Sequence, residues 1–332
     1  MQEVLVRTPQ LLTLSVDYHL KPKLSFFHQE LHMPKESIQR LIQKHPNIFA
    51  THSLENNIRP KLMGLFSRRL LFEPVHLSKM LKLYPQILDR SLNDYLLPLA
   101  QYFLKKLMFS PLELRTILTQ FPRLSSYSLV RIKRIEAYLS YEEGFTTEQV
   151  KRIFFQAPQI VCLKEEHLKE KIKFICDALQ LHQKNDDRLR KIISGMPSLL
   201  KCSLKGNLSP KLEYLRQAFN NSLDEVRDAI LLQPTLLGYS LEKRIRPRME
   251  KILKSGLQPK KITIAITLRE DRFESWLESQ NMSRDEKVMY KQKRRSLAFR
   301  NDGIKEKAPM HGKQIVDEEG KIILWNRPLP NM

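Results

Sequence analysis

Apolar residues along this chain recur at a fixed interval. Seven prolines, each followed two residues later by Leu or Ile, are spaced 36 to 39 residues apart: Pro9, Pro46, Pro85, Pro122, Pro158, Pro197 and Pro234. Further apolar residues stand eight, five and four positions before each proline, as Leu114, Ile117 and Leu118 do before Pro122. Such spacings place them on one face of a helix. A fixed period of this length is typical of stacked repeat proteins.

Each repeat contains the pattern of two helices and a proline-led turn. Capping residues open the first helix, as in Ser110 with Glu113 and Thr146 with Gln149. The anchor proline then ends that helix, because the residue before a proline is pushed out of the helical region. A serine usually follows six residues later and precedes a second helical pattern, which in five repeats contains a further proline: Pro22, Pro60, Pro98, Pro210 and Pro247. This second proline fits either a first turn or a kink in a helix that starts earlier, and the sequence is compatible with both.

The two ends depart from the repeat. Met1, Val4 and Leu5 match the apolar positions of later repeats, so we expect an end that is either truncated or unusually bare. Near Glu270 the expected proline is missing, and residues 268–277 read as a capping unit. We therefore predict a repeat array over residues 1–280 and a basic tail over residues 281–332, in which residues 313–325 have a hairpin pattern.

The net charge of the chain indicates a polyanionic partner, which the repeat pattern alone does not. The chain has 57 Lys and Arg against 36 Asp and Glu, a net charge of +21. The tail has 12 basic and 7 acidic residues, which gives +5 and leaves +16 for residues 1–280. Such an excess favours nucleic acid, because each neutralised phosphate releases a counterion.

Basic residues recur around the second proline. Lys21, Arg59 and Arg246 precede it, Lys23, Lys61, Lys211 and Arg248 follow it, Arg134 takes the place in a repeat without it, and Arg244 adds to the last cluster. Residues at one repeat position superimpose when repeats stack and so form a stripe. We expect these nine residues to contact phosphate. The alternative is an ordinary solvated helix face.

Catalytic and metal-binding patterns in the sequence are weak. His28 and His32 have helical spacing, but the acid Glu30 is one position away from the metalloprotease pattern HExxH. The three cysteines form no CxxC pair, and we interpret them as reduced, buried thiols. No Gly-rich phosphate loop and no apolar run of membrane-spanning length occurs. We predict a protein that is not an enzyme, has no cofactor or metal, and does not span a membrane.

Two segments carry a resemblance to a known family. His45 to Phe49 leading into Ser53 to Leu62, and Tyr239 to Arg248, resemble the repeat of the mitochondrial transcription termination factor (mTERF) family, and the resemblance covers about residues 1–277. It implies an all-α solenoid of about seven to eight repeats, right- or left-handed, each with two helices and a short 3₁₀ turn. It further implies a curved array with a basic concave face, in a mitochondrion or a chloroplast. The fifth repeat departs from the pattern, since it lacks both the serine and the second proline.

The resemblance and the charge together predict a monomer that binds double-stranded DNA. By occupying the duplex it would regulate organellar transcription termination, pausing or initiation, with an organellar polymerase or an RNA-modifying protein as partner. One alternative is binding of structured RNA in intron splicing or ribosomal RNA maturation. Another is a scaffold for protein interactions.

Overall fold

Helices make up all the regular structure that can be described in this protein. The structure is a computed structural model that describes residues 2–182 and 185–280, and no strand occurs among them. The predicted all-α class is therefore confirmed. The chain divides into two compact units, residues 1–268 and a second that begins at Arg269 and includes α16 (Glu270–Gln280). The predicted hairpin and most of the predicted tail lie outside the described residues.

The first helix of each repeat lies where the apolar pattern predicts it. These helices are α1 (Gln2–Arg7), α3 (Lys35–Lys44), α5 (Pro74–Leu83), α7 (Pro111–Gln120), α9 (Thr147–Gln156), α11 (Asp187–Gly195) and α13 (Leu223–Leu232). Leu114, Ile117 and Leu118 are each less than 5% exposed. Capping boxes open α7 and α9 at Ser110 and Thr146, as expected.

The anchor proline ends each first helix and begins a short turn. The residue before it leaves the helical region, as Tyr84 does with φ −150° and ψ 75°. The turns are η1 (Pro9–Thr13), η6 (Pro85–Asp89), η9 (Pro122–Ser126), η11 (Pro158–Cys162), η12 (Pro197–Lys201) and η14 (Pro234–Gly238), all 3₁₀, and α4 (Asn47–Ala50). The second repeat has one additional residue between its proline and Ser53, which accounts for an α turn there in place of the tighter 3₁₀ turn.

The second helices are assembled from consecutive α and π segments. They are η2 (Val16–Leu20), α2 (Lys21–Ser25) and η3 (Phe26–Glu30); η4 (Leu54–Ile58) and η5 (Pro60–Arg69); η7 (Leu92–Leu96), α6 (Leu97–Gln101) and η8 (Tyr102–Lys106); α8 (Leu129–Ala137) and η10 (Tyr138–Glu142); α10 (Glu165–Leu179); η13 (Leu204–Leu208) and α12 (Ser209–Ala218); and η15 (Leu241–Ile245) and α14 (Arg246–Lys254). An eighth, shorter repeat contains η16 (Pro259–Lys261) and α15 (Ile262–Ala265).

The structure shows how the second proline is accommodated. It lies inside the helix, and the turn before it is a π turn: the Ile58 N–H bonds the Ser53 carbonyl five residues back, at 3.0 Å. All five repeats with this proline open their second helix in this way. The fourth and fifth repeats lack the proline and open with α bonding, as from Ile132 to Ser128 at 3.2 Å. A proline ring clashes with the carbonyl four residues earlier in an α-helix, and the wider π turn moves that carbonyl away.

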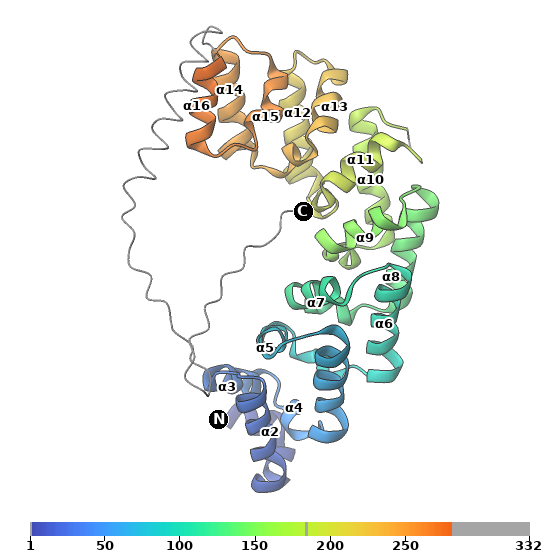
Figure 1. The fold of residues 1–332 in the computed structure, drawn as a ribbon, viewed down its shortest axis with the longest axis vertical. Coiled ribbons are helices and arrows are strands. Elements are labelled where there is room, and N and C mark those ends of the chain that lie inside the picture. The colour runs from blue at the N-terminus through green and yellow to red at the C-terminus, as the bar shows by residue number, and fades with distance from the viewer. Residues whose placement is uncertain (1, 183–184, 281–332) are drawn as a thin grey trace, which may run out of the picture. The chain divides into compact units, whose positions relative to one another are not determined.

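Successive repeats of the first unit pack side by side. Helix α5 packs on α7, α9 on α11, and α11 on α13, while the turns η6, η9, η11, η12 and η14 contact one another in sequence. Figure 1 shows α5, α7 and α9 on one side of this row and α6 and α8 on the other. The row bends toward the first helices over this stretch. The first and second helices therefore present two different surfaces.

Candidate nucleic-acid interface

A cation crosses each junction between neighbouring repeats of the first unit. It donates hydrogen bonds to backbone carbonyls in or just after the anchor turn of the next repeat, or, at the last junction, just after α15. The bonds run from Lys23 to Phe49, Lys61 to Leu88, Arg90 to Ser126, Arg131 to Leu163, Lys171 to Cys202, Lys211 to Leu237 and Arg248 to Leu268. Carbonyls at the end of a short helix lack helical partners and carry partial negative charge. These junction cations satisfy them.

Four of the nine residues predicted to contact phosphate belong to this set. Lys23, Lys61 and Lys211 are each 4% exposed, and Arg248 is 3% exposed. The Lys211 ammonium donates to the Leu237 carbonyl at 2.7 Å and to Asn207 Oδ1 at 2.8 Å. Burial lowers the pKa of the three lysine ammonium groups. The structure does not support the expectation that these four residues contact phosphate, because they are enclosed between repeats and donate to backbone carbonyls of the next repeat.

The position of these four residues follows from the π turn. In four of the five repeats with the second proline, the junction cation stands eight residues after the helix cap, as Lys61 does after Ser53; the exception is the third repeat, where Arg90 precedes the cap Ser91. In the fifth repeat, which has no π turn, Lys171 stands seven residues after Lys164. A π turn holds one more residue than an α turn, so the side chain that faces the next repeat shifts by one position.

The other five predicted residues are more exposed, and four of them already have local partners. Lys21 pairs with Asp17 at 2.6 Å, and Arg59 is held by Glu30 at 2.7 Å and Glu55 at 2.9 Å. Arg244 donates to the Ile266 and Leu268 carbonyls, and Arg246 pairs with Glu242 and lies over the Tyr214 ring. Arg134 is exposed on α8. The structure does not bring these residues together with the buried four as one exposed stripe.

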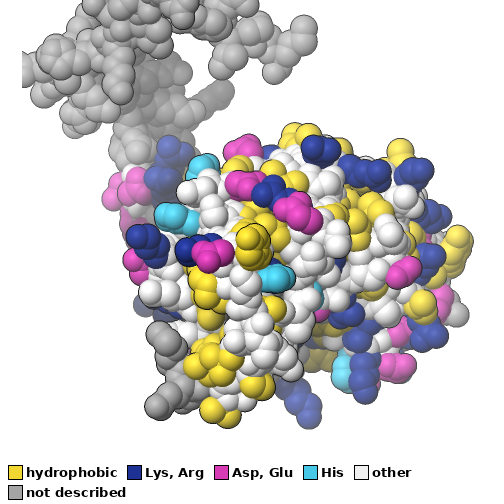
Figure 2. Space-filling view, turned by 90° about the horizontal axis from the view of Figure 1, so that it is seen from below, with side chains coloured by type: hydrophobic (Ala, Val, Ile, Leu, Met, Phe, Trp, Pro, Cys, Tyr) yellow, Lys and Arg dark blue, Asp and Glu magenta, His cyan; other side chains and the backbone are white. Residues whose placement is uncertain are grey.

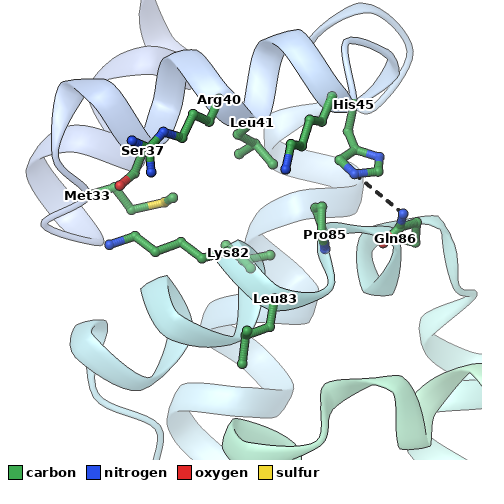
Figure 3. Close-up of a pocket in the computed structure, with 11 residues that line it drawn as sticks. Met33, Ser37, Arg40, Leu41, His45, Lys82, Leu83, Pro85 and Gln86 are labelled. Atoms are coloured by element: carbon green, nitrogen blue, oxygen red, sulfur yellow. Dashed lines mark hydrogen bonds between the residues drawn. The ribbon is translucent and has the colours of Figure 1, made fainter.

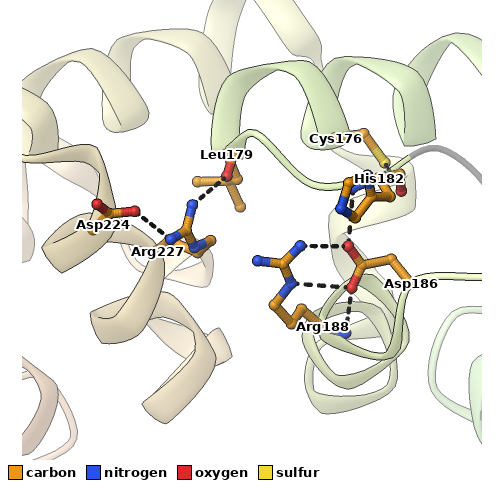
Figure 4. Close-up of polar contacts among 7 residues, drawn as sticks. All are labelled: Cys176, Leu179, His182, Asp186, Arg188, Asp224 and Arg227. Carbon is orange, nitrogen blue, oxygen red and sulfur yellow. Dashed lines mark hydrogen bonds and ion pairs between the residues drawn. The ribbon is translucent and has the colours of Figure 1, made fainter.

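A second set of cations ties four of the first helices, α7, α9, α11 and α13, to the repeat before them. These residues stand seven positions before the anchor proline: Arg115, Lys151, Arg190 and Arg227. Arg115 donates to the Leu71 carbonyl at 2.6 Å, and Lys151 pairs with Glu113 at 3.1 Å. Arg227 reaches the Leu179 carbonyl at 3.5 Å and also pairs with Asp224 (Figure 4). Much of the positive charge of the first unit therefore joins repeats together.

The loop before α11 is organised by one buried carboxylate. Asp186 is 7% exposed and accepts hydrogen bonds from the backbone N–H groups of His182 and Arg188 at 2.9 and 2.8 Å (Figure 4). The Arg188 guanidinium adds a contact at 2.8 Å, and together these donors hold the pKa of Asp186 well below its usual range.

The cysteine thiols differ in their surroundings. Burial raises the pKa of the Cys176 thiol to about 12. Cys162, in contrast, is exposed, so the prediction that all three thiols are buried is wrong.

One set of exposed cations has none of these partners. Arg40, Lys79, Arg152 and Lys191 each stand six residues before an anchor proline, on the solvent-facing side of α3, α5, α9 and α11. Within residues 2–182 and 185–280, none of the four forms an ion pair or a side-chain hydrogen bond. The position is occupied by Glu3 in the first repeat, Thr116 in the fourth and Asp228 in the seventh. We call these four residues the first-helix stripe.

The sequence contained the signal for this stripe. A cation recurs between the apolar positions eight and five residues before the proline, so its phase on the helix is opposite to the buried face. The prediction centred instead on the second proline, where basic residues are equally regular. Regular spacing did not separate the exposed set from the enclosed one.

An open groove lies beside the N-terminal end of this stripe, between α3 and α5. It has a volume of about 300 Å³, and its lining includes three cations: Arg40 and Lys44 from α3 and Lys82 from α5. Figure 3 shows Arg40 and Lys82 reaching the same end of the groove, near Met33. His45 lies at the other end of the groove, where burial lowers the pKa of its imidazole. Gln86 Nε2 lies 3.4 Å from His45 Nε2. The groove therefore combines three positive charges with a neutral imidazole at pH 7.

Basic side chains are not gathered in one place on the face of the molecule drawn in Figure 2. Figure 2 shows Lys and Arg side chains interspersed with hydrophobic and acidic ones on the face seen from below.

No group of three His, Cys, Asp or Glu side chains in the described part of the chain is placed to hold a metal ion. His28 Nδ1 lies 3.0 Å from the Met33 carbonyl, which occupies that ring nitrogen. Among the helices described, none is long and apolar enough to cross a membrane.

Comparison with known proteins gives one family and two relatives. The mTERF family model matches residues 1–185 and 184–274. "Transcription termination factor MTERF8, chloroplastic" of Arabidopsis thaliana is 25% identical over 270 residues, which cover 81% of this chain and 44% of that protein. "Transcription termination factor MTERF5, chloroplastic" of the same plant is 33% identical over 72 residues, or 22% of this chain and 14% of that protein. The chain thus spans less than half the length of these relatives.

Proposed function

Because this chain belongs to the mTERF family, we propose that it regulates organellar gene expression by binding duplex nucleic acid along the first-helix stripe. The stripe is the observation that carries this proposal. It places exposed cations at one repeat position on α3, α5, α9 and α11, and these cations have no acidic partner among the described residues. Stacking of repeats turns such positions into a line, and a phosphate backbone is a line of negative charge.

The groove between α3 and α5 supports the same ligand. Arg40, Lys44 and Lys82 surround it, and three cations around one opening favour a phosphate group. The first helices also lie on the side toward which the row bends between α5 and α9, which suits a surface that follows a duplex. Contacts of this kind give affinity and register, but no sequence preference.

The mechanism is occupancy. The protein binds the duplex through phosphate contacts and so blocks or pauses a polymerase, terminates transcription, or recruits a partner, and no covalent bond is made or broken. Arg, Asn or Gln side chains that reach base edges would supply any sequence preference. We propose duplex DNA as the ligand and a monomer as the binding form. The names of both relatives favour a chloroplast as the organelle.

The test is a charge variant of the stripe. Arg40, Lys79, Arg152 and Lys191 are all changed to Gln, and binding of duplex DNA, duplex RNA and single strands is measured across a salt series. Log affinity falls as log salt rises, and we expect the magnitude of this slope to decrease by about 3 to 4 for the preferred duplex. The affinity at 0.1 M salt should fall on the order of 10²-fold or more. Stronger binding of duplex RNA than of duplex DNA would replace DNA with RNA as the ligand.

A matched control removes the same charge from the other side of the repeats. Arg134, Lys173, Lys205 and Arg216 are exposed cations of the second helices, and changing them to Gln also subtracts four charges. We expect this control to change the salt slope by less than one contact, about 0.9. Equal losses in both variants would show that net charge, and not the stripe, drives binding.

A further inference from the structure

Two neighbouring repeats differ from the others in the residue that precedes the first helix. The chain enters each later first helix through a residue with positive φ, and at most repeats this residue is glycine or polar: His32, Gly144, Gln180, Asn220 and Gly256. The third and fourth repeats instead have Leu71 with φ 56° and Met108 with φ 57°. Large apolar side chains are disfavoured in this left-handed region. Their side chains are also exposed, by 49% and 63%.

The same two repeats expose a second apolar residue. Val75 at the start of α5 is 65% exposed, and Leu112 at the start of α7 is 50% exposed. Both pairs are in register, since Met108 and Leu112 stand 37 residues after Leu71 and Val75. We call these four side chains the apolar entry patch.

The patch rests on a firm base. Phe72 and Phe109 follow Leu71 and Met108, are buried, and donate backbone hydrogen bonds to Phe66 and Phe103 at 2.9 and 3.0 Å. Arg115 of α7 donates to the Leu71 carbonyl at 2.6 Å and so joins α7 to the loop that precedes α5. The exposed side chains are thus carried by backbone that is held on both sides, as a binding surface requires.

Cations flank the patch at matching positions. Arg68 and Arg69 stand three and two residues before Leu71, and Lys105 and Lys106 stand likewise before Met108. All four are exposed and lack an acidic partner among the described residues. The nearby acids are engaged elsewhere: Glu73 lies 3.7 Å from Arg115, and Glu113 pairs with Lys151 at 3.1 Å. Each repeat therefore offers an apolar pair next to two unpaired positive charges.

We propose that the apolar entry patch docks an acidic amphipathic helix of a partner protein. Apolar side chains on one face of that helix would cover Leu71, Val75, Met108 and Leu112, while Asp or Glu at its flank would meet the four cations. A second copy of this chain fits less well, since it would bring the same cations against one another. Val75 lies one turn before Lys79 of the first-helix stripe, so the partner would sit beside the proposed nucleic-acid surface.

The first test uses a designed peptide of about five helical turns with a Leu face and Glu flanks, labelled for fluorescence anisotropy. Leu71→Asn with Met108→Asn removes the apolar contact but keeps residues suited to positive φ, so folding is preserved. We expect this double variant to bind the peptide at least tenfold more weakly. A peptide with Ser in place of Leu should also bind weakly. Equal binding of both peptides, or of both proteins, would overturn the proposal.

Two further measurements separate the other occupants. Duplex DNA affinity of the Leu71→Asn, Met108→Asn variant should equal that of the wild type, and a loss would assign the patch to the nucleic-acid surface instead. Sedimentation should show no self-association that these substitutions abolish, since such an effect would make a second copy the occupant. Neither result depends on the stripe variant, so the two proposals can fail separately.

Discussion

Lys61 lies on the second helix of one repeat and Lys79 on the first helix of the next repeat, and the two side chains have opposite surroundings. Lys61 is 4% exposed and donates to the Leu88 carbonyl in the next repeat, whereas Lys79 is exposed on α5 without a partner among the described residues. Each belongs to a set that recurs at one repeat position. Recurrence therefore shows that the members of a set share an environment, but it does not show which environment. A buried ammonium is tolerated in the first set because backbone carbonyls accept hydrogen bonds from it.

The largest effect should come from removing a junction cation. Lys61→Met keeps the apolar stem and deletes the ammonium, so the Leu88 carbonyl loses its charged donor. We expect the free energy of unfolding in urea to fall by about 2 to 3 kcal/mol. Lys79→Met is the matched control and should change it by less than about 0.5 kcal/mol. Similar losses for both would remove the distinction between the two sets.

Asp186 allows the comparison of paired and unpaired cations to be tested on Arg188, a cation that is paired within its own helix start. Arg188 lies on α11 near Lys191 of the stripe but is bonded by Asp186. The folded pKa of this carboxyl is depressed, so its stabilisation is complete above the unfolded pKa of about 3.9 and is lost as the pH falls toward the folded pKa. Asp186→Asn should cost about 2 kcal/mol at pH 7.

The pH dependence supplies the check on Asp186. The stability gap between the wild type and Asp186→Asn should narrow in thermal unfolding below about pH 4. Asp17→Asn, which removes an exposed carboxylate paired with Lys21, should show a small gap at every pH. A gap for Asp186 that stays constant down to pH 2 would contradict the assignment.

A single stripe residue should have a smaller effect, on binding alone. Arg152→Gln should reduce the salt slope by about one and the duplex affinity about tenfold at 0.1 M salt, with stability unchanged. Arg246→Gln removes an equal charge, but that guanidinium is already paired with Glu242 and covers Tyr214. Its loss should weaken binding less. The opposite order would move the interface to the last repeats of the first unit.

The smallest effect is expected for Lys21→Gln. The ammonium and its partner Asp17 are both highly exposed, at 68% and 71%, and such ion pairs contribute about 0 to 1 kcal/mol. Neither unfolding in urea nor duplex affinity should change measurably. A clear loss of affinity with normal folding would place this second-helix residue in the interface, as the repeat pattern had suggested.

Much of the fold could be predicted from local patterns. The apolar spacing located the first helices, the anchor prolines located the turns, and Ser110 and Thr146 marked helix starts correctly, because each depends on residues within one turn of the helix. The site was predicted less well. Lys23, Lys61, Lys211 and Arg248 were assigned to phosphate, and the exposed set on the first helices was not recognised.

The sequence by itself determined the repeat, its period, its helical class and the phase of each side chain around its own helix. Tertiary structure decided which phases are covered, because a neighbouring repeat supplies the carbonyls that enclose Lys61 and leaves Lys79 in solvent. It also decided that a π turn precedes the second proline, which moves the inward-facing position by one residue. Periodicity describes one helix, whereas burial depends on the helix packed against it.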